Sequence, residues 1–256
     1  MVAAAVLVAA GAVPAVAGPA RAASAQTNDR TPFVQSLCPG TVAVYPPFGS
    51  PAQSSAYYGV ALASRISGGS LTVGRVARTT GMTATICGLL KFPELTATIP
   101  GVGCTVATEA SGCISFGVAT TTLDGMVDLP TTFTPGRTEV VVDKTPAANG
   151  GLQLSITSQV TTHVHIARFG VDCSVGPITV NLTTGVSGPL QGQAVTGPLT
   201  LATARIVGAS FAVPGASAST TCPSQLVPAT DQLVGLPAPV GSARFSAPLQ
   251  LANSLQ

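Results

Sequence analysis

Short runs of alternating and β-branched residues, separated by glycine and proline, fill the chain after residue 57. The 256 residues include 28 glycines and 21 prolines, and helical periodicity is almost absent. Such a pattern is typical of an antiparallel sandwich or barrel, of which we expect the sandwich. One short helix is expected at residues 228–236. Strands are expected at residues 58–64, 70–77, 82–87, 94–99, 114–122, 138–143, 153–166, 178–184, 199–207 and 243–251.

The domain organisation follows from changes in composition along the chain. Residues 26–56 are rich in proline and read as an irregular N-terminal arm. A first β domain is expected at 57–147 and a second at 148–256. Residues 101–106 resemble residues 170–175, which favours two related, sandwich-like halves, although similar strand composition would also explain the match.

The first residues predict export. Val2–Ala17 is almost wholly apolar, and the small residues of two Ala-x-Ala patterns end at Ala22 and Ala25. We therefore expect residues 1–25 to be a signal peptide, although no lysine or arginine precedes the apolar run. A membrane anchor is the alternative, but the run is shorter than the roughly 20 residues that a span needs. The mature protein is expected to be secreted or associated with the cell envelope, with no helical membrane span after cleavage.

The six cysteines are expected to form disulfides, because an exported chain folds in an oxidising compartment. Cys104 and Cys113 flank a short polar loop that a hairpin could close. Cys173 and Cys222 are the cysteines of the second half, so they pair if the halves fold separately. Cys38 and Cys87 remain, and their bond would fasten the arm to the first sheet.

The charge balance excludes one large class of partner. Only 8% of the residues are charged and the formal net charge is +2. Without a basic patch to neutralise phosphates, a nucleic acid is not expected as a partner. A weakly charged surface fits contact with an envelope protein, a glycan or a lipid.

His163 and His165 are the only histidines and the sharpest candidate site. In a strand, residues two apart point to the same face, so the two imidazoles could hold a metal ion if a carboxylate joined them. Asp172 is the nearest in sequence. The simpler interpretation is two exposed or hydrogen-bonded strand histidines. We expect no metal, no cofactor and no catalytic residue, since no G-x-S-x-G elbow and no obvious carboxylate pair are present.

The second half carries a family resemblance. Residues Gly170–Gly188, with Cys222-Pro223 and Leu236-Pro237 before a final strand, resemble secreted β-rich envelope proteins of high-GC Gram-positive bacteria. That group is functionally uncharacterised. The resemblance implies a secreted envelope β protein and supplies no catalytic residue.

Together these features predict an exported, non-enzymatic structural or binding protein of the cell envelope or extracellular space. A secreted hydrolase with an unrecognised site is the first alternative, and it would need a histidine, a carboxylate and a serine in one cleft. An oligomeric envelope pore is the second alternative. A filled apolar interior would argue against a pore.

Overall fold

The computed structural model describes residues 32–41, 58–74, 77–92, 94–109, 111–123, 127–143, 151–167, 170–197 and 201–253. The expected signal peptide and most of the expected arm lie outside these residues. The helices are α1 (Pro32–Leu37), α3 (Val106–Glu109) and α4 (Val227–Val234). The strands are β1 (Tyr58–Val73), β2 (Ala77–Phe92), β3 (Thr96–Ile99), β4 (Cys113–Phe116), β5 (Ala119–Leu123), β6 (Val127–Asp143), β7 (Gln153–Ile166), β8 (Val171–Thr183), β9 (Val186–Ser187), β10 (Leu190–Gln191), β11 (Gln193–Thr196), β12 (Ala202–Gly208), β13 (Ala216–Ser217) and β14 (Arg244–Asn253).

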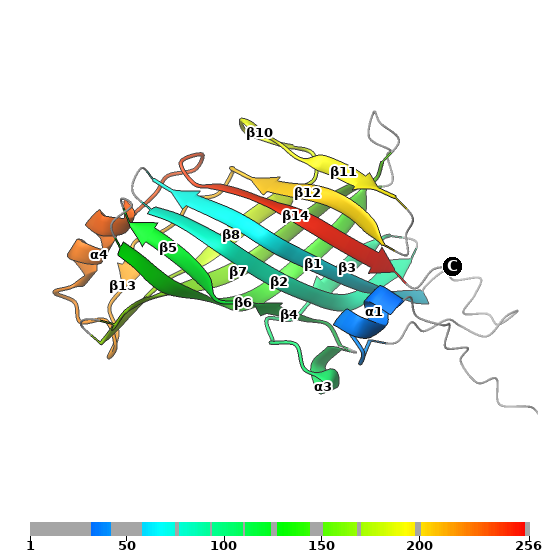
Figure 1. Ribbon diagram of the computed structural model, residues 1–256, viewed down its shortest axis with the longest axis horizontal. Coiled ribbons are helices and arrows are strands. Elements are labelled where there is room, and N and C mark those ends of the chain that lie inside the picture. The colour runs from blue at the N-terminus through cyan, green and yellow to red at the C-terminus, as the bar shows by residue number, and fades with distance from the viewer. Residues whose placement is uncertain are drawn as a thin grey trace, which may run out of the picture.

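Twelve of the strands form one antiparallel sheet that returns on itself. Its order is β11-β12-β14-β1-β2-β3-β6-β7-β8-β13, while β4 and β5 pair with β2 beside β3. The ring is joined where Val207 of β12 pairs with Thr183 of β8. A second bridge pairs Val195 of β11 with Leu152, just before β7. Figure 1 shows the long strands wrapping around a shared interior, and we call this arrangement the closed sheet.

Strand alternation divides the closed sheet into an inner and an outer face. In β7, Leu154, Ile156 and Val160 are buried, whereas Thr157 and Gln159 between them are exposed. The inner-face residues form one apolar cluster that includes Ile86 of β2, Ile156 of β7, Ile206 of β12 and Leu249 of β14. The expected all-β, antiparallel, disulfide-stapled fold is confirmed.

The two β domains expected at 57–147 and 148–256 share this one sheet and one core. β6 and β7, on either side of the expected boundary, pair along most of their length. The C-terminal β14 pairs with β1. The layers that face each other across the core are therefore opposite walls of the same closed sheet. The similarity between residues 101–106 and 170–175 has no structural counterpart, because the first segment is a loop entering α3 and the second enters β8.

Most expected strands are present, but several are longer. The strands expected at 58–64 and 70–77 are joined in β1, which passes Gly68 and Gly69 through a shift of register. The glycines mark a bulge there and not a turn. The helix expected at 228–236 is α4, which ends at Gly235 with a φ of 75°, a conformation that glycine adopts without strain.

One end of the closed sheet is covered on its outer face by the N-terminal clamp, which we define as α1, α3 and the disulfides Cys38–Cys87 and Cys104–Cys113. Val34 and Cys38 pack against Ala61 and Ala63 of β1. The buried Glu109 of α3 accepts a hydrogen bond from the backbone N–H of Gly40.

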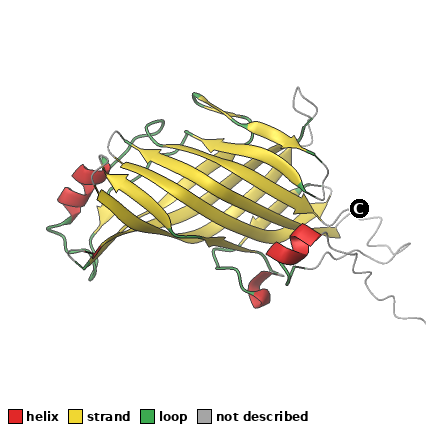
Figure 2. Ribbon diagram, viewed as in Figure 1, coloured by secondary structure: helices red, strands yellow, loops and turns green. Residues whose placement is uncertain are grey.

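The other end is closed by the C-terminal cap, which we define as residues 209–238 with the disulfide Cys173–Cys222. It contains β13 and α4, which lie together at one end in Figures 1 and 2. Val234 of α4 packs against Leu129 and Val164. Among the described residues, none of the helices has the length and apolar character needed to cross a membrane.

Candidate functional site

The inner face of the closed sheet surrounds an apolar cavity of about 70 Å³. It lies between β1 and β2 on one side and β7 and β8 on the other. Hydroxyl-bearing residues are a small minority of its wall. The lining side chains are Ile66, Leu71, Met82, Thr83, Ala84, Ile86, Ile114, Phe116, Phe133, Ile156, Ser158, Val160, Thr162, Ile178, Val180, Leu182, Phe211 and Phe245.

A second cavity of about 30 Å³ continues toward the C-terminal cap. Leu71, Thr162 and Ile178 line both cavities. The cap supplies Phe211 to the first, and Val213 and Leu236 among others to the second. The cap therefore closes the interior with apolar side chains.

Five hydroxyl groups buried in the closed sheet are paired with one another. Thr121 Oγ1 lies 2.7 Å from Thr79 Oγ1 and 2.6 Å from Thr131 Oγ1, which makes a short chain across β2, β5 and β6. Thr138 Oγ1 lies 2.7 Å from Ser158 Oγ. Because these groups are already satisfied, the interior offers a ligand mainly apolar contacts.

The closed sheet has a seam beside the first cavity. On one side, β6 pairs with β5 as far as Thr131 and with β3 from Thr138. Between them, residues 132–137 have no strand partner on that side within the described part of the chain. Phe133 and Phe116 lie here, half-buried, with ring centroids 5.6 Å apart, and both line the cavity. The seam is thus the place where the wall of the cavity consists of side chains without a continuous ladder.

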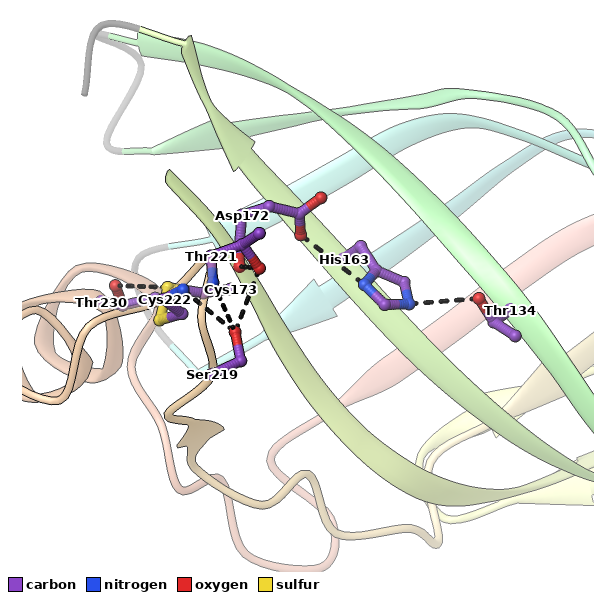
Figure 3. Close-up of polar contacts among 8 residues, drawn as sticks. All are labelled: Thr134, His163, Asp172, Cys173, Ser219, Thr221, Cys222 and Thr230. Carbon is purple, nitrogen blue, oxygen red and sulfur yellow. Dashed lines mark hydrogen bonds and ion pairs between the residues drawn. A yellow bond between two sulfur atoms is a disulfide. The ribbon is translucent and has the colours of Figure 1, made fainter. Parts of the chain in front are cut away.

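The outer face carries the second candidate, centred on His163 of β7. His163 Nε2 lies 3.1 Å from Thr134 Oγ1 of β6, and Nδ1 lies 3.6 Å from Asp172 Oδ1 of β8. Figure 3 shows the three side chains following one another across the strands. His165 lies directly opposite Asp172 in the strand register. Carboxylate, imidazole and hydroxyl together can move a proton or bind a cation.

Asp172 is held in place by the C-terminal cap. Its backbone N–H donates to the carbonyl of Thr221, and the Thr221 hydroxyl donates to the carbonyl of Asp172. The adjacent disulfide Cys173–Cys222 fixes the same two segments (Figure 3). Asp172 Oδ1 is buried and has no hydrogen-bond partner in the described structure. A buried acceptor without a donor is unusual and costs free energy.

All six cysteines lie where the sequence predicts, in the three predicted pairs. The Sγ atoms of Cys87, Cys104 and Cys113 lie within 4.8 Å of one another. Because each is in a disulfide, none is a free thiolate able to bind a metal. Three disulfides indicate an oxidising compartment.

The sequence pointed to His163, His165 and Asp172 and missed Thr134. Thr134 follows Thr132 at a spacing of two, which places both on one face of a strand, but nothing in the sequence aligns that strand with His163. The cavity was also missed. No protein-family model, curated protein or solved structure matches the chain.

Proposed function

We propose that the protein is exported and binds a small apolar molecule, or the apolar end of a lipid, inside the closed sheet. The observation that carries this proposal is the cavity of about 70 Å³ beside the seam. Protein interiors are packed closely enough that voids larger than a water molecule are few. At about 24 cal/mol per Å³, a cavity of this size costs about 1.7 kcal/mol. That the protein keeps a cavity which lowers its stability supports a functional role for the cavity.

The chemistry of the wall defines the class of ligand. Its side chains are aliphatic or aromatic almost throughout, and the few hydroxyls nearby include paired ones such as Ser158. Such a cavity stays dry and favours an apolar occupant. A charged or sugar-like ligand would lose its hydration without gaining partners. A lipid is thus favoured over a glycan as the partner for the interior.

The size of the cavity sets how a ligand enters. An engineered apolar cavity of about 150 Å³ holds benzene, so the space here is smaller than one aromatic ring needs. A longer chain therefore enters only when Met82, Phe116 and Phe133 turn aside. Met82 is flexible and the two rings are half-buried at the seam, so these side chains are the ones best able to move.

Uptake of a fluorescent fatty acid by the mature, disulfide-intact protein tests the proposal. A graded series of straight-chain alcohols and acids should displace the probe, more tightly as the chain lengthens. Ala84 is buried and lines the cavity, so Ala84→Leu should fill the space and abolish uptake. Thr157→Val on the exposed outer face is the control and should bind as the parent does. Absence of saturable uptake by the parent, or equal uptake by Ala84→Leu, contradicts the proposal.

A secreted hydrolase is the second candidate, because Asp172, His163 and Thr134 follow one another as carboxylate, imidazole and hydroxyl. The binding function is favoured over it because neither cavity is lined by these residues. If the protein hydrolyses short-chain esters and His163→Gln abolishes this activity, the hydrolase would replace the binding function that we propose. A pore is disfavoured because an interior filled with apolar side chains offers ions no aqueous path.

A further inference from the structure

We propose that His163, His165 and Asp172 form a binding site for a divalent transition metal of the zinc class on the outer face of β7 and β8. The proposal is independent of the apolar cavity, which lies on the opposite face of the same strands. The residues come from two paired strands, and the C-terminal cap fixes the backbone of Asp172.

The strand register gathers the three side chains. His163 and His165 are two residues apart in β7 and point outward, while Val164 between them is buried. Their Cα atoms are separated by about 6.7 Å, twice the rise of a strand. Asp172 is paired with His165 and lies diagonally across from His163. The donor atoms of the three side chains do not all lie within 4.8 Å of one another, so one ion above the two strands is reached by all three only after the His165 ring turns.

The separation of the His163 and Asp172 donors fits a shared ion. Nδ1 and Oδ1 are 3.6 Å apart, which is too long for a hydrogen bond. Two ligands at about 2.0–2.1 Å from a tetrahedral zinc ion lie about 3.4 Å from each other. The two atoms thus already stand close to the spacing of neighbouring ligands. His165 is exposed and lies opposite Asp172 in the strand register, so we propose that its ring rotates toward Asp172 to complete the set when the ion binds.

The hydrogen bonding around His163 also favours a cation. If the Nε2–H group of His163 donates a hydrogen bond to Thr134 Oγ1, then Nδ1 carries a lone pair. This lone pair faces the carboxylate oxygen of Asp172. Oδ1 is buried and receives no hydrogen bond. Two acceptors would then face each other with no proton between them, and a cation bound there would satisfy both. Binding of one imidazole nitrogen while the other donates to a neighbour is the usual arrangement of metal-ligating histidines.

The ligand set selects the metal class. Two imidazoles with one carboxylate suit Zn²⁺, Cu²⁺ or Ni²⁺, whereas Mg²⁺ and Ca²⁺ prefer oxygen ligands alone. Three protein ligands leave a fourth position of a tetrahedral ion for water. The backbone of Asp172 is fixed by its two hydrogen bonds to Thr221, so little ordering of this residue is needed on binding.

Histidine NMR with added Zn²⁺ tests the inference directly, because the chain contains only 2 histidines. We expect one equivalent of Zn²⁺ to shift the signals of both rings, with Nδ1 of His163 as the ligating nitrogen, and Mg²⁺ to shift neither. The opposite result is a His163 whose Nε2 carries the lone pair and accepts a hydrogen bond from Thr134. If the rings are in this state and do not respond to Zn²⁺, the proposed site is wrong. A shift of one ring alone also overturns it.

Calorimetric titration of variants with Zn²⁺ provides the second readout. His163→Ala and Asp172→Asn should each weaken binding by about 100-fold, and Thr134→Val, which removes only the supporting hydroxyl, by about tenfold. Glu139→Gln removes an exposed carboxylate from β6 and should leave the affinity unchanged. The thermal midpoint of each variant shows whether it is folded. Unchanged affinity in Asp172→Asn, or equal losses in Asp172→Asn and Glu139→Gln, contradicts the proposal.

Discussion

The inner and outer faces of the closed sheet are made by the same strands and have opposite chemistry. In β7, the inner residues Ile156 and Val160 line an apolar cavity, whereas His163 lies outward beside a threonine and a carboxylate. The outer face is polar mainly through threonine, serine and glutamine, since only 8% of the residues are charged. Because alternation separates the two surfaces, the two ligands that we propose would meet entirely different chemistry on the same wall.

The disulfides also differ by face. Cys87 of β2 and Cys113 of β4 lie opposite each other in the strand register on the outer face, where their disulfides to Cys38 and Cys104 form part of the N-terminal clamp. Cys173 has the same alternation as the buried Val171 and Val175 and fastens the C-terminal cap over the end of the interior. The clamp therefore covers the wall from outside, and the cap closes the space inside it.

Removal of the long disulfides should have the largest effect on stability. Cys38–Cys87 and Cys173–Cys222 each span 49 residues, so loop entropy predicts that replacing either pair by alanine lowers the free energy of unfolding by about 4 kcal/mol. Cys104–Cys113 spans 9 residues and should cost about 2.6 kcal/mol. Urea unfolding of the three double variants measures these losses. A cost for the Cys104–Cys113 pair equal to that of the long pairs would show that loop length does not govern the effect.

Truncation of a side chain on the inner face should have the second-largest effect on stability. Ile206 in β12 is fully buried, and Ile206→Ala should lower the free energy of unfolding by about 3 kcal/mol through lost burial and a new cavity. Thr203→Ala in the same strand faces outward and should change it by less than about 0.5 kcal/mol. The same urea series measures both. Similar losses in the two variants would remove the distinction between the faces.

The buried hydroxyl chain should give the smallest of these effects. Thr121→Val removes the central member and leaves the hydroxyls of Thr79 and Thr131 without that partner, which should cost about 1–2 kcal/mol. Thr120→Val, one residue away on the exposed face, is the control and should be nearly neutral. Thermal unfolding of the pair measures the difference. A neutral Thr121→Val would show that the inner face tolerates unpaired hydroxyls.

Much of the fold could be predicted from alternation, but the closure of the sheet could not. Residues 153–166 were predicted as a strand and form β7, because most of its inward positions are apolar, including Leu154, Ile156 and Val160. Only residues 138–143 of β6 were expected as a strand, and the earlier part contains Pro130 and Pro135, a residue type that is rare inside strands. Pro135 lies in the stretch that lacks a partner on one side, where a missing N–H is tolerated.

The candidate sites were predictable to different degrees. The spacing of His163 and His165 fixes their shared face, and chain proximity suggested Asp172. Thr134 joins them only through the register of β6 with β7, which depends on the whole sheet. The cavity depends on which side chains meet across the closed sheet, such as Ile86 and Ile178, and no local pattern specifies that meeting.

The central claim is that the interior holds an apolar ligand. Native mass spectrometry of the protein collected after export, without detergent, tests it most directly, with organic extraction to identify what is released. We predict a bound apolar molecule in the parent and in Thr157→Val, and none in Ala84→Leu. The account would be contradicted if the parent protein, folded with its three disulfides, carried no bound molecule and also took up no member of the alcohol and acid series.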